Sequence, residues 1–386
     1  MKWRWSMMNK RKGYASHFSG NGTEKEAVMA KLQMNKDLLE SAVLGASVLG
    51  GGGGGSEEDA IEAGELALKI GTPVLLDVDD LEPWQTVVSC SMVTCPYRKD
   101  PFIAPRARVR SVELLLESGI GRPAGLIPNE CGSFWITNGW IESAILGIPL
   151  VDAPCNGRGH PTPEMGSMGL HRVPDYVSIQ SFAGGNPAKG AYVEGVLKGS
   201  IEMVSNMIRQ DACIVGGIMA VARNPVEASY IRDNAAPGAL KQAIRIGDAM
   251  KKAREKGPGA VIEAAASMIS GIILHRGEIE TVDRFTAGGM DTGTVSVGGY
   301  EITFWKEYMT LEKDGERVAT FPDLINIFSC ETGRAVSSDL LLPGMQVALV
   351  SASRRELILG GGMRSPELFE PAETILGKEI LTFLHL

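Results

Sequence analysis

Hydrophobic residues recur at helical spacing on both sides of a run of glycines near the start of the chain. Before the run they fall on one helical face, at Leu38, Leu39, Ala42, Val43, Ala46 and Leu49. After it, Ser56 begins a second helical pattern whose first turn carries carboxylates, which the helix dipole favours. The six consecutive glycines, Gly50 to Gly55, therefore connect two predicted helices. Because glycine is costly to order, such a run is typical of backbone that turns sharply or approaches a ligand closely.

Two hypotheses account for the glycine run. The backbone N–H groups of Gly51, Gly52, Gly53 and Gly54 could cradle an anionic or polar ligand at the start of the second helix. The alternative is a flexible linker, but the apolar helical patterns on both sides favour the cradle. No Gly-Lys-Ser/Thr follows the run and no strand precedes it, which argues against a P-loop and a dinucleotide fingerprint. A nucleotide-binding ATPase is disfavoured for the same reason.

Strand-like and helical segments alternate between residues 35 and 270. Strands are predicted at residues 73–78, 87–93, 126–127 and 148–152, and helices at 108–118, 136–146, 191–210, 237–256 and 259–270. This alternation predicts an α/β domain with a mixed or parallel sheet. Asp77, Glu130 and Asp152 each follow a predicted strand, and ligand groups in such folds lie at the carboxyl ends of strands.

From residue 271 the apolar period shortens and turn residues separate short β-rich segments. Asp314-Gly315 between two of them predicts a hairpin. Residues 271–386 are therefore predicted to form a β-rich C-terminal domain. Residues 1–34 are predicted to be a poorly ordered N-terminal extension, whose basic start lacks the apolar stretch of a secretory signal.

Composition narrows the class of protein. A length of 386 residues favours two domains. The net charge of −8 argues against a surface that binds nucleic acid or anionic membranes. No apolar stretch reaches the ~18 residues of a membrane span. The six cysteines include no CxxC pair, which fits a reduced, cytoplasmic protein whose cysteines, apart from Cys155, are small buried residues.

A segment rich in proline and glycine, residues 153–175, follows Asp152 and is a candidate functional loop. Asp152, Cys155, His160 and His171 occur in the pattern D-x2-C-x4-H-x10-H. Asp152, His160 and His171 could bind a divalent metal such as zinc, although the spacing matches no common zinc motif. The alternative is that these histidines bond to backbone carbonyls. Cys155 could instead be a nucleophile with His160 as its base.

Three acids and one arginine are further candidates for chemistry. Asp152 could act as a base or form a structural pair with Arg158. Glu130 could be a general base or could cap the following helix. Glu164 could complete a carboxylate pair with either acid. Arg158 could bind a substrate carboxylate in bidentate fashion.

Taken together, five motifs resemble the DUF917 family, which is also called the S-methyl thiohydantoin desulfurase family. They are Leu44-Gly45-Ala46 leading into the glycines, Asn129-Glu130-x-Gly132, residues 146–152, Gly157-Arg158-x-x-Pro161-x-x-Glu164-Met165, and residues 321–325. The resemblance covers most of residues 35–375. It implies an α/β N-terminal domain, a β-rich C-terminal domain, and hydrolysis of an S-methylated thiohydantoin to a hydantoin with loss of methanethiol. The sequence differs from the common pattern at His160, where a hydrophobic residue is usual.

These observations predict a hydrolase that acts on a hydantoin-type ring by metal-assisted attack of water. The predicted site lies between the two domains, with the glycine run beside Asp152 and Glu130. The alternative is a non-catalytic subunit of a hydantoinase- or oxoprolinase-like enzyme. The expected partners are a small-molecule substrate and further copies of this chain, with no nucleic acid and no membrane.

Overall fold

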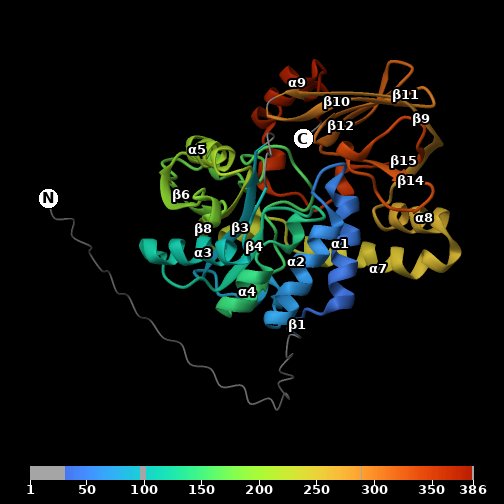
Figure 1. Cartoon of the computed structure of the whole chain (residues 1–386). Helices are drawn as coiled ribbons and strands as arrows, with labels where there is room; N and C mark the ends of the chain where they lie inside the picture. The colour runs from blue at the N-terminus through green and yellow to red at the C-terminus, as the bar shows by residue number, and fades with distance from the viewer. Residues whose placement is uncertain (1–30, 96–100, 288, 385–386) are drawn as a thin grey trace, which may run out of the picture. The chain divides into compact units, whose positions relative to one another are not determined.

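Two sheets organise the part of the chain that the computed structural model describes, residues 31–95, 101–287 and 289–384 (Figure 1). In the first sheet the strand order is β1-β2-β5-β4-β3-β8-β6-β7, and in the second it is β13-β12-β11-β10-β9-β15-β14. The predicted fold class, an α/β N-terminal part with a mixed sheet and a β-rich C-terminal part, is confirmed.

The elements have the following bounds. The first sheet contains β1 Leu32–Gln33, β2 Val74–Leu76, β3 Thr86–Thr94, β4 Gly125–Pro128, β5 Leu150–Val151, β6 Ser178–Gly184, β7 Val193–Gly199 and β8 Ile218–Glu227. The second contains β9 Ile272–Ala287, β10 Met290–Val297, β11 Tyr300–Trp305, β12 Glu307–Lys313, β13 Glu316–Thr320, β14 Leu324–Ser329 and β15 Gln346–Ala352. The α-helices are α1 Lys36–Gly50, α2 Glu57–Ile70, α3 Pro105–Leu115, α4 Trp140–Leu146, α5 Ile201–Ile214, α6 Ala228–Asn234, α7 Ala239–Ala253, α8 Pro258–Met268 and α9 Glu370–Leu376.

Strand direction divides the first sheet into two regions. β2, β5, β4 and β3 run parallel, whereas β8, β6 and β7 extend the sheet in antiparallel fashion. Because the carboxyl ends of parallel strands meet at one edge, Asp77, Glu130 and Asp152 all follow strands at that edge, as predicted.

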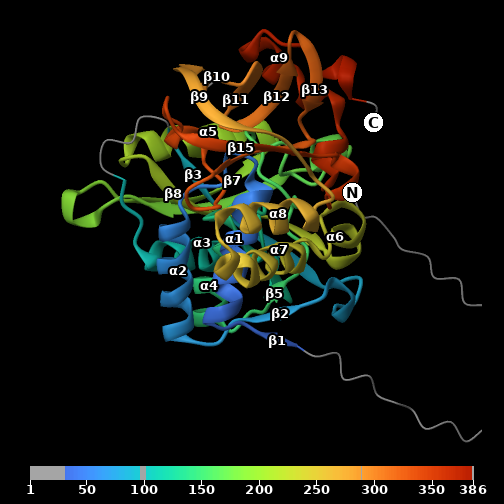
Figure 2. The ribbon, with the colours of Figure 1, turned by 90° about the vertical axis from the view of Figure 1, so that its right-hand side faces the viewer.

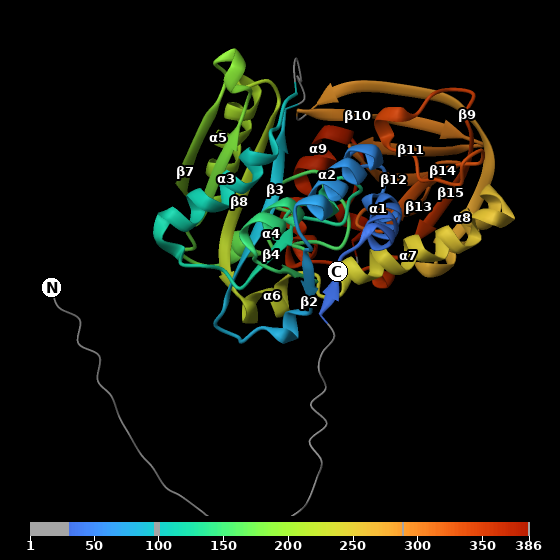
Figure 3. The ribbon, with the colours of Figure 1, turned by 60° about the horizontal axis from the view of Figure 1, so that its bottom comes forward.

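Alternating side chains let helices cover both faces of the antiparallel region (Figure 3). Phe182 of β6 packs with Val204 and Ile208 of α5. Its neighbour Ser181 points to the other face, where its hydroxyl donates to Ser111 O of α3 at 2.6 Å. Successive strand residues face opposite sides of a sheet, so α5 and α3 pack on opposite faces of β6.

One prediction about local structure is wrong, and another lies mostly outside the described residues. Residues 191–210 are not one helix: β7 pairs with β6, and α5 begins only after Ser200, whose side chain accepts from Met203 N. The strand pairing overrides the helical spacing of the apolar residues. The predicted extension, residues 1–34, lies mostly outside the described residues, but Leu32–Gln33 forms β1 against β2.

The C-terminal sheet is antiparallel throughout, and its predicted hairpin is confirmed. Asp314 and Gly315 join β12 to β13 with φ angles of 51° and 83°, which suit a tight hairpin turn. The tail after β15 is part of the core, since Met363 and Phe369 pack against Trp305 and Met309. No helix among the described residues is long and apolar enough to span a bilayer.

The prediction of reduced cysteines is wrong for one pair. Cys95, just after β3, forms a disulfide with Cys213 of α5 across 118 residues of sequence. Cys213 is exposed rather than buried. The sequence spacing carries no sign of this pair, because only the packing of α5 on the sheet brings the two residues together.

Helix α1 is buried along most of its length, and its closest neighbour is α7 (Figure 2). A Cβ atom on Gly45 of α1 would lie 1.8 Å from Ala243 O, and one on Gly247 of α7 would lie 1.9 Å from Ser41 O. The two helix backbones are therefore in contact at a glycine of α1 and at a glycine of α7. This contact fixes the position of α1 and so of the glycine run that follows it.

We predict that Gly45→Ala destabilises the protein even though alanine is the better helix former by about 1 kcal/mol. The added methyl group must push α7 away, and overpacking of this kind costs about 1–3 kcal/mol. Chemical denaturation measures the change. Gly259→Ala in α8 is the matched control, because its Cβ would meet only Arg276 Nη1 at 3.8 Å. Equal unfolding midpoints for Gly45→Ala and wild type would contradict the prediction.

Candidate functional site

The glycine loop, residues 51–55, is an ordered and hydrogen-bonded connection between α1 and α2. Gly51, Gly52, Gly54 and Gly55 have positive φ angles of 58°, 92°, 95° and 82°, which side chains rarely allow. Gly51 O accepts from Tyr308 N at 2.7 Å, Gly52 O from Ser338 N at 2.8 Å, and Gly54 O from Phe134 N at 2.7 Å. The loop thus joins the α/β part to the β-rich part, which does not fit a flexible linker.

Carbonyl groups of the glycine loop accept hydrogen bonds from other parts of the protein, but several of its N–H groups donate none. Gly53 N donates to Gly50 O at 3.2 Å. The N–H groups of Gly52, Gly54 and Gly55 have no hydrogen-bond acceptor within the described ranges. Gly53 and Gly55 line a cavity of about 400 Å³. The backbone cradle that the sequence predicts stays a prediction, and these free donors are compatible with it.

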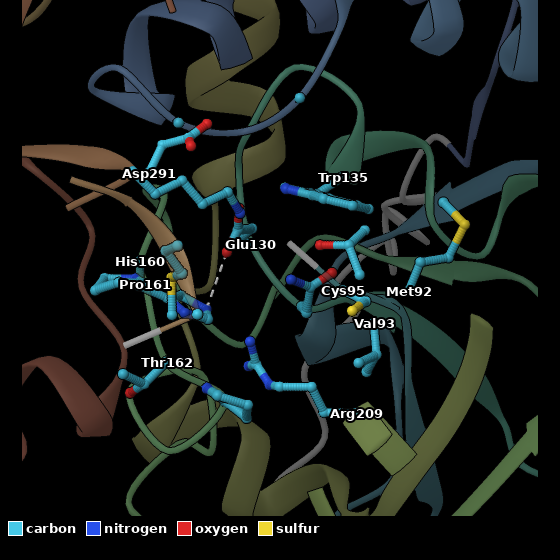
Figure 4. A pocket seen from close by; sticks show the side chains of 18 of the residues that line it. Met92, Val93, Cys95, Glu130, Trp135, His160, Pro161, Thr162, Arg209 and Asp291 are labelled. Carbon is cyan, nitrogen blue, oxygen red and sulfur yellow. Dashed lines mark ion pairs between the residues drawn. The ribbon is translucent and has the colours of Figure 1, made fainter. Parts of the chain in front are cut away.

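The cavity draws its walls from both parts of the chain (Figure 4). Its titratable and cationic lining residues are Glu130, His160, Arg209, Arg223, Asp291, Lys306 and Asp339, and its other lining residues include Met92, Asn129, Trp135 and Pro161. A second cavity of about 830 Å³ adjoins it and shares Gly53, Gly55 and Trp135 as lining.

Glu130 and His160 form a close buried pair in this cavity. Glu130 lies two residues after β4, and His160 lies in the long loop after β5. His160 Nε2 is 3.1 Å from Glu130 Oε2, and both side chains are nearly inaccessible (dashed line in Figure 4). The alternative role of Glu130 as a helix cap is not observed, since Gly139 precedes α4.

Burial sets the protonation of this pair. It raises the pKa of Glu130 to about 8, with the negative charge of Glu307 adding to the rise and the positive charge of Lys306 opposing it. It lowers the pKa of His160 to about 3, assisted by the positive charges of Lys306 and Arg223. At neutral pH His160 is therefore neutral, and Glu130 exchanges its proton close to the working pH.

Three cations face the cavity without a carboxylate partner. Arg223 of β8 and Arg209 of α5 form no ion pair or side-chain hydrogen bond with any other described residue, and Arg223 is almost fully buried. Figure 4 shows Arg209 reaching toward the middle of the cavity. Lys306 contacts the Trp135 ring, with 5.3 Å between Nζ and the ring centroid, and has an unusual positive φ of 63°. Unpaired buried cations favour an anionic group on the ligand.

Asp152 and Cys155 lie outside this cavity lining. Asp152 Oδ1 accepts from Leu240 N at 2.8 Å and from Lys241 N at 3.4 Å, so its partner is the N-terminus of α7 rather than Arg158. The Cys155 thiol donates to Ser89 Oγ at 3.2 Å, and burial raises its pKa to about 11. The thiolate that a nucleophile requires is therefore disfavoured.

Arg158 contacts backbone carbonyls and an aromatic ring, which indicates a structural role. Its Nη1 donates to Pro322 O at 2.9 Å and to Asp323 O at 2.6 Å, and its guanidinium carbon lies 4.3 Å from the centroid of the Phe321 ring. It is fully buried and holds the start of β14. Glu164 also lies outside the cavity lining, where its charge acts on the two cavity arginines.

The three predicted metal ligands are not brought together. His171 Nε2 lies 3.1 Å from Glu367 Oε1, Asp152 caps α7, and only His160 faces the cavity. Within residues 31–95, 101–287 and 289–384, no group of three or more His, Cys, Asp or Glu side chains is arranged to hold a metal. A divalent metal stays a prediction that metal analysis of the purified protein can test.

The sequence reasoning missed Arg209, Arg223, Lys306 and Glu307. Arg223 interrupts an otherwise apolar strand, which is a signal that the sequence contains. Lys306 alone separates β11 from β12, and Glu307 then lies fully buried with neither carboxyl oxygen bonded. No local pattern shows that this turn reaches the glycine loop.

The raised pKa of Glu130 predicts how stability depends on pH. Its ordinary value is near 4.3, so the stabilisation from holding the proton is complete below that pH and is lost as the pH rises through about 8. Glu130→Gln cannot ionise, so its melting temperature should gain on wild type between pH 5 and pH 8.5. Glu202→Gln, at an exposed position, should show no such trend. A pH-independent difference for Glu130→Gln would show that Glu130 is not held protonated.

Comparison with known proteins supports one family. Family models described as "S-Me-THD-like, N-terminal domain" and "S-Me-THD-like, C-terminal domain" match residues 37–188 and 199–360. A crystal structure of a Chromobacterium violaceum protein aligns with a TM-score of 0.69 at 19% identity, covering 90% of this chain and 99% of the other, which shows a shared fold. No curated protein matches. The chain therefore belongs to the S-Me-THD-like family.

Proposed function

We propose that the protein is a hydrolase that acts on a hydantoin-type ring and removes methanethiol from an S-methyl thiohydantoin. The observation that carries the proposal is the buried Glu130–His160 pair, 3.1 Å apart, on the wall of the cavity beside the glycine loop. Membership of the S-Me-THD-like family supports the substrate class. The cavity of about 400 Å³ has room for a substituted five-membered ring.

The reaction needs a base for water and an acid for the departing sulfur. Ionised Glu130 takes a proton from water while the water oxygen bonds to the ring carbon that carries sulfur. The carbon–sulfur bond then breaks, and the protonated Glu130 returns its proton to sulfur, so that methanethiol leaves. The second water proton moves from the added oxygen to the ring nitrogen, so that a ring carbonyl beside an N–H group remains. One carboxyl group serves both steps because its pKa of about 8 lies near the working pH.

The surrounding groups would orient the reaction and stabilise its charge. Neutral His160, whose Nε2 lies 3.1 Å from Glu130 Oε2, packs against the carboxyl group and limits its orientation. Negative charge develops on the ring when water adds, and Lys306 and the free N–H group of Gly55 are donors on the cavity wall that can stabilise it.

Arg209 and Arg223 give the cavity a place for an anionic substituent. They approach from α5 and β8, and neither has a carboxylate partner among the described residues. A carboxylate on the ring substituent would supply the negative charge that these two arginines lack as a partner. This role replaces the one that the sequence predicts for Arg158, whose Nη1 is committed to backbone carbonyls.

Glu130→Gln should lower kcat/KM for an S-methyl thiohydantoin by about 10²–10⁴-fold, the usual contribution of a general base. In wild type, kcat/KM should rise with pH through about 8, since the active form is the carboxylate. Methanethiol release, followed with a thiol reagent, measures both. Cys155→Ser is the matched control and should retain turnover. Loss of activity in Cys155→Ser with full activity in Glu130→Gln would replace the base mechanism by a nucleophilic one.

Arg209→Gln should raise KM by about 10–100-fold for a substrate with a carboxylate substituent, which corresponds to loss of one charged hydrogen bond. The same variant should leave KM unchanged for an analogue whose carboxylate is replaced by an amide. Steady-state kinetics with both compounds separates anion binding from a general structural effect. An equal rise in KM for both compounds would show that Arg209 does not recognise the anion.

A further inference from the structure

Glu307 is a fully buried carboxyl group for which the proposed reaction has no step. Neither of its oxygens has a hydrogen-bond partner, although its exposed fraction is 0%. Such groups are rare in folded proteins because each costs free energy, and they concentrate where chemistry requires them. Lys306, the preceding residue, has a positive φ of 63°, a sparsely populated conformation for a residue with a side chain.

The glycine loop brings Glu307 and Glu130 close to one another from opposite sides. A Cβ atom on Gly53 would lie only 1.9 Å from Glu307 Oε1, so this carboxyl group lies directly against the loop backbone. On the other side, a Cβ atom on Gly132 would lie 2.5 Å from Gly54 Cα and 3.0 Å from Glu130 Oε1. Only glycine backbone separates the two carboxyl groups along this path, and Glu130 Oε1 is also unbonded.

Two positive charges near Glu307 favour its ionised form, and the same two side chains also act on Glu130. Arg158 and Lys306 both act on Glu307 with positive charge and oppose the rise that burial causes in its pKa. One guanidinium nitrogen of Arg158, Nη2, is buried without a partner beside Gly51. Glu130 faces neutral His160 as its nearest partner. The negative charge of Glu307 therefore acts on Glu130 across a region with little water to screen it.

We infer that the buried carboxylate of Glu307 acts across the glycine loop on Glu130 and sets the pH range in which Glu130 can accept a proton from water. Glu307 is a positioning residue, since it does not line the cavity and touches no substrate. The inference rests on the proposed function for its kinetic consequence. The coupling between the two carboxyl groups can be measured without any substrate.

The kinetic test is the pH profile of Glu307→Gln. Removing the negative charge should move the rising limb of kcat/KM to lower pH by about 1 unit, so the variant gains activity relative to its own maximum at pH 6. Glu307→Asp, which withdraws the carboxylate by one methylene, should shift the limb less and in the same direction. Glu316→Gln removes an exposed charge from the same sheet and should leave the limb in place. An unshifted limb in Glu307→Gln overturns the inference.

The substrate-free test is a double-mutant cycle in melting temperature at pH 8.5. Glu130→Gln should stabilise wild type more than it stabilises the Glu307→Gln variant, because Glu130 is held protonated less strongly once Glu307 is neutral. Equal gains in both backgrounds would overturn the coupling. If no variant and no wild-type protein releases methanethiol, the proposed function fails, while this cycle still decides whether Glu307 acts on Glu130.

Discussion

Close packing against the glycine loop is the constraint on which the site depends. A side chain on Gly52 would lie 2.6 Å from the Tyr308 ring, one on Gly53 would meet Glu307, and one on Gly54 would lie 2.7 Å from Gly132 Cα. Three backbone carbonyls of the loop accept hydrogen bonds from Tyr308 of β12, Ser338 of the β14–β15 connection and Phe134 of the loop after β4. Because the loop has no side chains, the β11–β12 turn and the strand-end loop of Glu130 can approach one another through it. The cost in conformational entropy is offset by the burial of α1, whose position against α7 is fixed by glycines at the helix contact.

The framework around the loop follows from local patterns in the sequence. Helical periodicity places α1 and α2 on either side of the glycines, and turn chemistry at Asp314-Gly315 predicts the β12–β13 hairpin. Parallel pairing of β2, β5 and β4 explains why Glu130 lies at the edge formed by the carboxyl ends of these strands. These features depend on neighbours in the chain, so periodicity and turn preferences are enough to predict them.

The composition of the site depends on long-range packing and could not be predicted in the same way. Arg209 and Arg223 meet because α5 packs on β8, and Cys95 reaches Cys213 for the same reason. Asp152 and Glu130 occupy equivalent strand-end positions in the sequence. Asp152 accepts hydrogen bonds from backbone N–H groups at the N-terminus of α7, whereas Glu130 has no such helix partner. His171 likewise has Glu367, 196 residues away, as its partner. Residue type and strand-end position identify candidates, while the segment that packs against each one determines its role.

The distribution of unbonded polar atoms separates the candidate functional site from the rest of the core. Fourteen buried side-chain nitrogen or oxygen atoms among the described residues lack a hydrogen-bond partner, and six of them belong to Glu130, Arg158, His160 and Glu307 around the glycine loop. Each such atom costs about 1–3 kcal/mol, so selection for stability alone would remove or pair them. Hydrophobic replacement of a buried charged set is often stabilising. The concentration of these atoms at one loop, beside a cavity with unpaired arginines, is therefore expected of a site in which chemistry and not stability has chosen the residues.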